Sequence, residues 1–136
     1  MAVVKPDAST LAKQTEPDSA DLARAAIACL EEYQGERILH LDVRERTPLA
    51  DSMIIASGRS RLHVGALRDR LLRRLKELGA GRLQVEGGQR SDWILIDGGG
   101  LWIHLFHPEA REFYNLEKLW SEEAPSERSL EETPPL

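Results

Sequence analysis

The stretch "WILIDGGGLWIHLFHPEAREFYNLEKLW", residues 93–120, combines two apolar segments, a run of glycines and an amphipathic segment. Residues 93–97 and 101–106 have the length and apolar content of strands, and the glycines between them are typical of a tight turn. We therefore expect the two segments to pair as a hairpin. Pro108 suits the first turn of a following helix, where its missing N–H costs nothing, and Glu109 places a negative charge at the positive end of the helix dipole.

The segments before this hairpin alternate between helical and extended patterns. Apolar residues recur at helical spacing in two of them, with Asp18 or Ser19 as the N-cap of the first and Ser60 as the N-cap of the second. Gly35 and Gly79 are expected to end these helices. In chain order, the predicted elements are a helix at 20–34, strands at 37–43 and 52–57, a helix at 61–78, strands at 82–86, 93–97 and 101–106, and a helix at 108–120.

This order predicts how the strands assemble. Several neighbouring strands are joined by short turns, and one pair is joined across a helix. We therefore expect an α/β fold with a mixed five-stranded sheet and packed helices, rather than a doubly wound parallel sheet. The short apolar run at 52–57 suits a central strand, because a strand that is buried on both faces is apolar throughout.

The composition is that of a soluble globular domain. The chain has 136 residues, of which 41% are hydrophobic and 30% charged, enough for one core. We expect a flexible lead-in at residues 1–18, one working domain at 19–120 and an acidic tail at 121–136. No run approaches the ~20 apolar residues of a membrane span, and the N-terminus lacks the patterns of signal and transit peptides. A cytoplasmic location without membrane attachment is expected, which agrees with the single cysteine, Cys29.

The charge distribution narrows the classes of partner. A net charge of −5 argues against non-specific duplex binding as the main activity, because such binding needs a basic surface. The predicted helix at 61–78 nevertheless has a basic outer face, on which the cations outnumber Asp69 and Glu77. A solvated helix face is the commoner explanation of such charge, and an interaction surface is the alternative. The cations are Arg61, Arg68, Arg70, Arg73, Arg74 and Lys76.

His104 and His107 form an H-x-x-H pattern that raises the question of a metal site. Residues three apart in a strand point to opposite faces, so the two imidazoles converge only if the chain bends sharply before Pro108. A zinc site would also need further Cys or His ligands, and few remain. We therefore expect no metal and no cofactor, with His104 hydrogen-bonded within the sheet and His107 capping or shaping a turn.

Catalytic motifs are sparse. The turn Gly58-Arg59-Ser60 lies between a strand and a helix N-terminus, where backbone N–H groups can hold a phosphate. No P-loop or dinucleotide-binding pattern accompanies it, and no closely spaced pair of Asp residues follows to hold magnesium. A helix cap explains the turn adequately. A nucleotidyltransferase-like nucleotide-binding enzyme, which would use this turn to hold a phosphate, is therefore kept only as the alternative function. No serine lies in a G-x-S-x-G pattern, and Cys29 is expected to be buried.

Large aromatic side chains stand near the ends of the last elements. Trp93 begins a strand directly after a polar loop, and Tyr114 lies on the closing helix. Both residue types are enriched at protein interfaces, because they combine a large contact area with a polar group. From the residues alone, an interface position and a core position are about equally supported for these two. A core position is favoured for Trp102, Phe106 and Phe113.

Three stretches carry a family resemblance: "ADSMIIASGRSRLHV" (50–64), "VEGGQRSDWILID" (85–97) and "GGGLWIHLFHPEAREFYNLEKLW" (98–120). Together they closely resemble the ribosomal silencing factor family, also called Iojap, over about residues 20 to 120. The "GGQRSD" and "GGG" loops are more glycine-rich than many family loops. The residues that fall in the family's order are Asp51, Ser57-Gly58, His63-Val64, Glu86-Gly87, Asp92-Trp93, His104, Tyr114 and Leu119-Trp120.

The resemblance implies a fold and a function. The fold is a nucleotidyltransferase-like core without its catalytic acids. The function is to bind the large ribosomal subunit, through its subunit-face protein of the L-fourteen family, and so to obstruct small-subunit joining and lower translation when nutrients are scarce. Members are similar in forming homodimers when free. The implied function is binding without catalysis, so the resemblance implies that the protein is not an enzyme. The implied partner-binding residues are Trp93, Tyr114, Asp92, Gly87 and His107, and the candidates for contact with ribosomal RNA or for steering are Arg68, Arg70, Arg73, Arg74 and Lys76.

Overall fold

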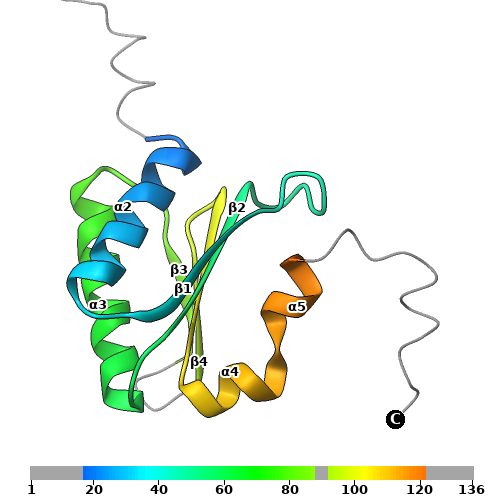
Figure 1. Ribbon diagram of the computed structural model, residues 1–136. Coiled ribbons are helices and arrows are strands. Elements are labelled where there is room, and N and C mark those ends of the chain that lie inside the picture. Colours follow the sequence, from blue (N-terminus) through cyan, green and yellow to red (C-terminus); the bar gives the residue numbers. More distant parts are fainter. Residues whose placement is uncertain (1–16, 88–91, 122–136) are drawn as a thin grey trace, which may run out of the picture.

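The computed structural model describes residues 17–87 and 92–121. Figure 1 shows a twisted sheet with two helices on one side and a pair of short helices on the other. In chain order, the elements are α2 (Ser19–Glu32), β1 (Glu36–Asp42), β2 (Ser52–Ser57), α3 (Arg61–Glu77), β3 (Gln84–Glu86), β4 (Trp93–Asp97), β5 (Leu101–Phe106), α4 (Pro108–Tyr114) and α5 (Leu116–Ser121).

Within the described residues, the sheet has five strands in the order β1-β2-β5-β4-β3. Strands β2 and β5 are parallel, and the other neighbouring strands are antiparallel. The predicted mixed sheet and the predicted hairpin of β4 and β5 are therefore confirmed. Strand β5 is the central strand, and β2 beside it is also interior, which explains the apolar run at 52–57.

Each face of the sheet has its own core. The face under α2 and α3 holds the larger one, which includes Leu67, Leu71 and Leu75 of α3. Leu78, the last residue of the helix predicted at 61–78, lies beyond the end of α3 with 46% of its surface exposed. Cys29 is buried in this core, as predicted, and burial raises the pKa of its thiol.

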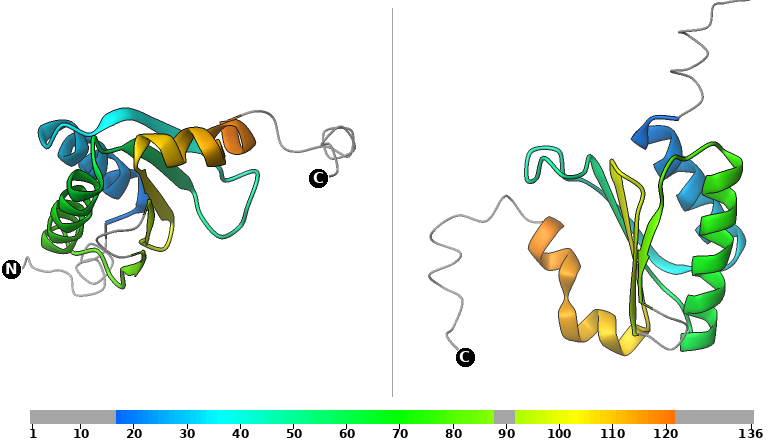
Figure 2. Two further views of the ribbon diagram at one scale, coloured as in Figure 1. Left: turned by 90° about the horizontal axis from the view of Figure 1, so that it is seen from below. Right: turned by 180° about the vertical axis from the view of Figure 1, so that it is seen from behind.

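The opposite face holds a smaller core under α4 and α5. Met53, Ile55 and Phe106 are its buried sheet residues, and Trp102 packs against them partly buried. Helix α4 is anchored here by Arg111, whose buried guanidinium donates to the Ser57 hydroxyl at 2.8 Å. Two further views show α4 and α5 running along the face turned away from α2 and α3 (Figure 2).

The predicted caps are present, but several boundaries differ. Asp18 and Ser60 accept backbone hydrogen bonds as N-caps of α2 and α3. Helix α2 ends at Glu32, before the predicted stop at Gly35, because Gln34 adopts a left-handed conformation with φ 68°. Strand β1 begins and ends one residue before the predicted 37–43, and a bulge between Glu36 and Leu39 shifts its register against β2. Strand β3 has only three residues instead of the predicted 82–86.

The single closing helix predicted at 108–120 is wrong. Asn115 has φ 49° and ψ 46°, which ends α4 and turns the chain before α5 begins. Asn tolerates this left-handed conformation better than most residues, and its N–H caps α4 by donating to the carbonyl of Arg111. After the turn, Trp120 packs edge-on against Trp102, with ring centroids 6.2 Å apart, and its carbonyl accepts from the Arg46 guanidinium.

The predicted terminal segments fall mostly outside the described residues. Of the lead-in at 1–18 the structure describes Pro17 and Asp18, and of the tail at 121–136 it describes the backbone of Ser121. Within the described ranges, no helix has both the length and the apolar content needed to cross a membrane.

Candidate functional site

Five rings form one group on the α4 side of the sheet, which we call the aromatic cluster: Trp93, His104, Phe106, Phe113 and Tyr114. The Trp93 ring centroid lies 4.8 Å from that of Tyr114 and 5.1 Å from that of Phe106. Phe106 is fully buried, whereas Tyr114 is 50% exposed and Phe113 is 80% exposed. The cluster therefore runs without interruption from the core of the domain to its surface.

The prediction that Phe113 belongs to the core is wrong. Helix α4 faces the sheet through Ala110 and Arg111, so Phe113 projects away from it. Its ring contacts only the neighbouring Tyr114 among the described aromatic rings, at 5.1 Å and nearly perpendicular. The core prediction for Phe106 is confirmed, and Trp102 is partly buried.

Strand register brings the cluster together. Trp93 is paired with Phe106 across the β4–β5 hairpin, and His104 lies two residues earlier on β5, so it shares a face with Phe106. Helix α4 begins directly after β5, and the backbone N–H of His107 donates to the carbonyl of Asp92 at 2.9 Å. That hydrogen bond holds the start of α4 beside the start of β4. Tyr114, at the other end of α4, then lies against Trp93.

The other predicted contact residues lie around Trp93. Gly87 has φ +101°, and a Cβ atom there would lie 2.7 Å from the Trp93 carbonyl oxygen. The carboxylate of Asp92 accepts from the Arg61 guanidinium at 2.6 Å, which ties β4 to the start of α3. His107 is the N-cap residue of α4 but makes no side-chain capping bond. The fold thus brings all five predicted partner-binding residues together, while residues 88–91 of the same loop lie outside the described part.

His104 connects this surface with the core. Its side chain is 6% exposed, and its Nδ1 accepts a hydrogen bond from the Trp93 indole N–H at 2.9 Å. Burial lowers the pKa of the imidazole from 6.5 to about 4. The predicted hydrogen-bonded histidine is confirmed, but its partner could not be predicted without the register. Once Trp93 is paired with Phe106, His104 lies two residues earlier on the same face of β5, and this position identifies Trp93 as its partner.

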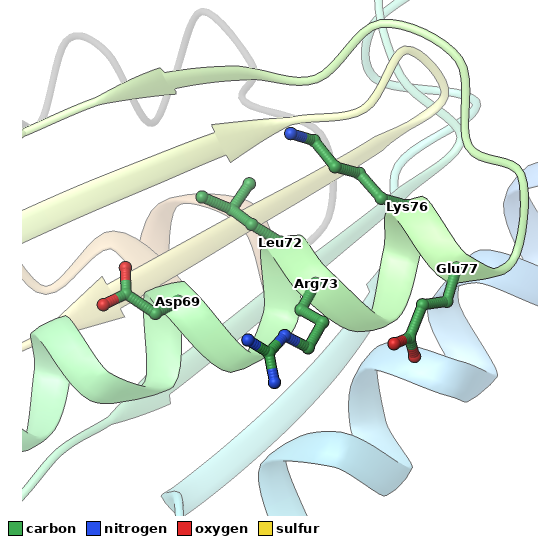
Figure 3. A pocket seen from close by; sticks show the side chains of 5 residues that line it. All are labelled: Asp69, Leu72, Arg73, Lys76 and Glu77. Carbon is green, nitrogen blue, oxygen red and sulfur yellow. The ribbon is translucent and has the colours of Figure 1, made fainter.

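The cations of α3 are not a free basic surface. Arg68 pairs with Asp69 and Arg74 with Glu32, each at 2.9 Å, and the Arg70 guanidinium lies 4.6 Å above the ring of Tyr33. Arg73 and Lys76 line a hollow together with Asp69, Leu72 and Glu77, which gives it mixed charge (Figure 3). The helix also lies on the opposite side of the sheet from the aromatic cluster (Figure 1).

The turn that could hold a phosphate makes its hydrogen bonds within the protein. The N–H of Arg59 donates to His63 Nδ1 at 2.9 Å, and the N–H of His63 donates to the Ser60 hydroxyl at 3.1 Å. A Cβ atom on Gly58 would lie 2.8 Å from a methyl group of Val64, so the turn is packed tightly against α3. The predicted cap is therefore the observed role of this turn.

The carboxylates near the strand ends have partners within the protein. Asp42 binds the Arg44 guanidinium at 2.7 Å, and this hydrogen bond holds the pKa of Asp42 at about 2. Asp51 accepts from the Ser19 hydroxyl at 2.8 Å. Over residues 17–87 and 92–121, no group of three or more His, Cys, Asp or Glu side chains is arranged to hold a metal ion.

A compact α/β domain that carries a half-exposed aromatic cluster on one face has the features of a macromolecule-binding module. The family described as "Ribosomal silencing factor during starvation" matches residues 16–135. The ribosomal silencing factor RsfS of Zymomonas mobilis is 38% identical over 107 residues, which are 79% of this chain and 80% of that relative. The chain therefore belongs to the ribosomal silencing factor family, as its motifs had indicated.

Two further relatives extend the comparison. A crystal structure of a protein from Chromobacterium violaceum superposes with a TM-score of 0.75 at 34% identity, and the match covers 81% of this chain and 92% of that one. The mouse protein named "Mitochondrial assembly of ribosomal large subunit protein 1" is 33% identical over 98 residues, which are 70% of this chain and 43% of the mouse protein. The fold is thus shared with a solved structure of similar size.

Proposed function

We propose that this member of the ribosomal silencing factor family binds the large ribosomal subunit and blocks joining of the small subunit by steric exclusion, lowering translation when nutrients are scarce. The observation that carries the proposal is the aromatic cluster, in which Tyr114 and Phe113 remain 50% and 80% exposed. The family's description, silencing during starvation, supports the setting. The name of the mouse relative, which refers to assembly of the large ribosomal subunit, supports that subunit as the partner.

The proposed docking surface consists of Trp93, Tyr114, Asp92, Gly87 and His107, and its direct partner is the subunit-face protein of the L-fourteen family. Aromatic side chains that are half buried in their own domain are pre-organised, so they lose little conformational entropy on binding. A specific interface of ordinary size buries roughly 1,200–2,000 Å². A domain of this size can supply that area and compete with the small subunit by mass action.

Other parts of the proposal concern state and location. We propose that the chain is a homodimer when free and that it works in the cytoplasm, where bacterial ribosomes are found. Arg73 and Lys76 are the stronger candidates for contact with ribosomal RNA, because Arg68, Arg70 and Arg74 already have partners within the domain. The mechanism needs no covalent step, so we propose a binding protein rather than a nucleotidyltransferase-like enzyme.

Co-sedimentation tests the proposal. The full chain is mixed with purified large subunits, small subunits or joined ribosomes and is centrifuged, and subunit joining is then measured at increasing protein concentration. We expect binding to large subunits and a dose-dependent loss of joining. Binding without loss of joining would contradict the steric mechanism, and no binding would contradict the partner. Titration with nucleoside triphosphates and magnesium, followed by calorimetry, tests the enzymatic alternative. A stoichiometric nucleotide site would favour that alternative, and no binding is expected for the proposed function.

A further inference from the structure

We propose that His104 is a positioning residue for the docking surface: its imidazole accepts the indole N–H of Trp93 and fixes the orientation in which that ring is presented to the ribosome. The Nε1–Nδ1 distance is 2.9 Å. The inference rests on the proposed function, since it assigns to a buried residue a role in the contact that Trp93 makes.

The other contacts of the indole do not set its direction. Phe106 and Tyr114 flank Trp93 with ring centroids at 5.1 and 4.8 Å. These contacts attract by dispersion and by weak preferences for offset or tilted geometry, which leave more than one orientation of the indole open. The hydrogen bond is directional, because a rotation that reversed the indole would carry its only polar atom away from His104. The bond therefore selects one orientation of the ring.

The hydrogen bond also defines the state of the imidazole. An indole N–H can only donate, so Nδ1 of His104 must carry a lone pair and the proton of the neutral ring lies on Nε2. Burial keeps the ring neutral, with a pKa of about 4. The acceptor on which the indole orientation depends is therefore present throughout the ordinary range of pH.

A histidine at this position also carries a cost in stability. Nε2 of His104 is buried and has no hydrogen-bond partner among the described residues. A buried donor without an acceptor is unfavourable, and an apolar side chain of similar size would avoid that loss. What the imidazole contributes, and an apolar side chain could not, is the acceptor for Trp93.

Two matched variants of the full chain test this role. In His104→Asn the amide oxygen can occupy a place close to Nδ1, whereas His104→Leu has a similar size and no acceptor. We expect the Leu variant to bind purified large subunits about tenfold more weakly and the Asn variant to stay within about threefold of wild type. In the NMR spectrum, the Trp93 indole N–H signal should move in the Leu variant and stay in place in the Asn variant, with the signals of Trp102 and Trp120 as internal references.

The outcomes separate the two proposals. Equal binding by wild type and a folded Leu variant, or equal losses in the Leu and Asn variants, would overturn the positioning role. Trp93→Ala is run in the same assay, and undiminished binding by that variant would instead overturn the docking surface itself. If the Leu variant does not fold, the ¹⁵N shifts of His104 in the wild-type chain decide the matter. A proton on Nδ1 would exclude the bond to Trp93, and a proton on Nε2 supports it.

Discussion

The ring of Trp93 at the start of β4 lies 4.8 Å from the ring of Tyr114 at the end of α4. The contact joins the two ends of a continuous segment, which runs from Trp93 through β4, the hairpin turn, β5 and α4 to Tyr114. Any change that moves α4 therefore also changes the surface around Trp93. The exposed ring of Tyr114 and the partly buried ring of Trp93 therefore form one unit of the surface.

Truncation of either ring should weaken binding to the large subunit. Trp93→Ala and Tyr114→Ala are each expected to reduce the binding free energy by roughly 2 kcal/mol or more, because aromatic anchors dominate interfaces. Leu78→Ala is the matched control, since Leu78 is also a partly exposed apolar residue, at 46%, but follows α3 on the other side of the sheet. Co-sedimentation at graded subunit concentrations measures the change. Equal losses in all three variants would show that the aromatic cluster has no special part.

Gly87→Ala should destabilise the fold at the backbone beside Trp93. The alanine would need φ near +101° and would place its Cβ 2.7 Å from the Trp93 carbonyl oxygen, so both backbone strain and a clash arise. We expect the free energy of unfolding to fall by about 2–3 kcal/mol. Gly99→Ala is the control, because Gly99 has φ +88° but nothing within 4 Å of its Cβ position, which leaves strain alone at about 1 kcal/mol. Urea denaturation compares the two, and an equal loss would contradict the clash.

The free energy of unfolding should depend on pH through His104. Its pKa is about 4 in the folded chain and 6.5 in the reference state, so between these values the unfolded chain binds more protons. The free energy of unfolding therefore falls as the pH is lowered from 6.5 to 4, by up to about 3 kcal/mol. Urea denaturation at several pH values measures this slope, which His104→Asn should remove.

Asp42 provides the control for that window. Its pKa is lowered from 3.8 to about 2 by the hydrogen bond with Arg44, so its contribution is present above pH 3.8 and is lost as the pH falls toward 2. Asp42→Asn should therefore leave the slope between pH 6.5 and 4 unchanged. A slope in this window that survives in His104→Asn would mean that other groups cause it.

Asn115 should accept glycine better than alanine. The residue has φ 49° at the junction of α4 and α5, a conformation that glycine adopts without strain and alanine does not. Asn115→Ala is expected to lower the free energy of unfolding by about 1 kcal/mol, and Asn115→Gly by less. Thermal unfolding of the two variants measures this. A reversed order would indicate that helix propensity, rather than the turn, dominates here.

Local chemistry predicts much of this fold. Ser60 as a cap, Pro108 in the first turn of a helix and the glycine turn between β4 and β5 each depend on a few neighbouring residues, and all three are present. The break at Asn115 could not be predicted in the same way, because residues on both sides of it have helical periodicity. The turn is favoured by a distant contact, that of Trp120 with Trp102.

The sequence predicted which residues belong to the candidate site better than it predicted how they are arranged. The family motifs named Trp93 and Tyr114 as contact residues, and the fold places their rings together. That His104 supports Trp93 follows only from the register of β4 against β5, and Phe113 is exposed only because of how α4 is rotated. Both depend on tertiary structure, which single-residue patterns do not encode.

The position of β5 has a consequence for how the domain forms during synthesis. Among the described residues, β5 is the last strand along the chain and the central one in the sheet, where it separates the β1–β2 pair from the β3–β4 pair. Until Leu101–Phe106 has left the ribosome that makes it, the nascent chain can form only two separate hairpins, neither with a complete core. Because His104 and Phe106 belong to this strand, a chain that ends before it lacks the complete aromatic cluster. The proposed docking surface is therefore assembled only late in synthesis.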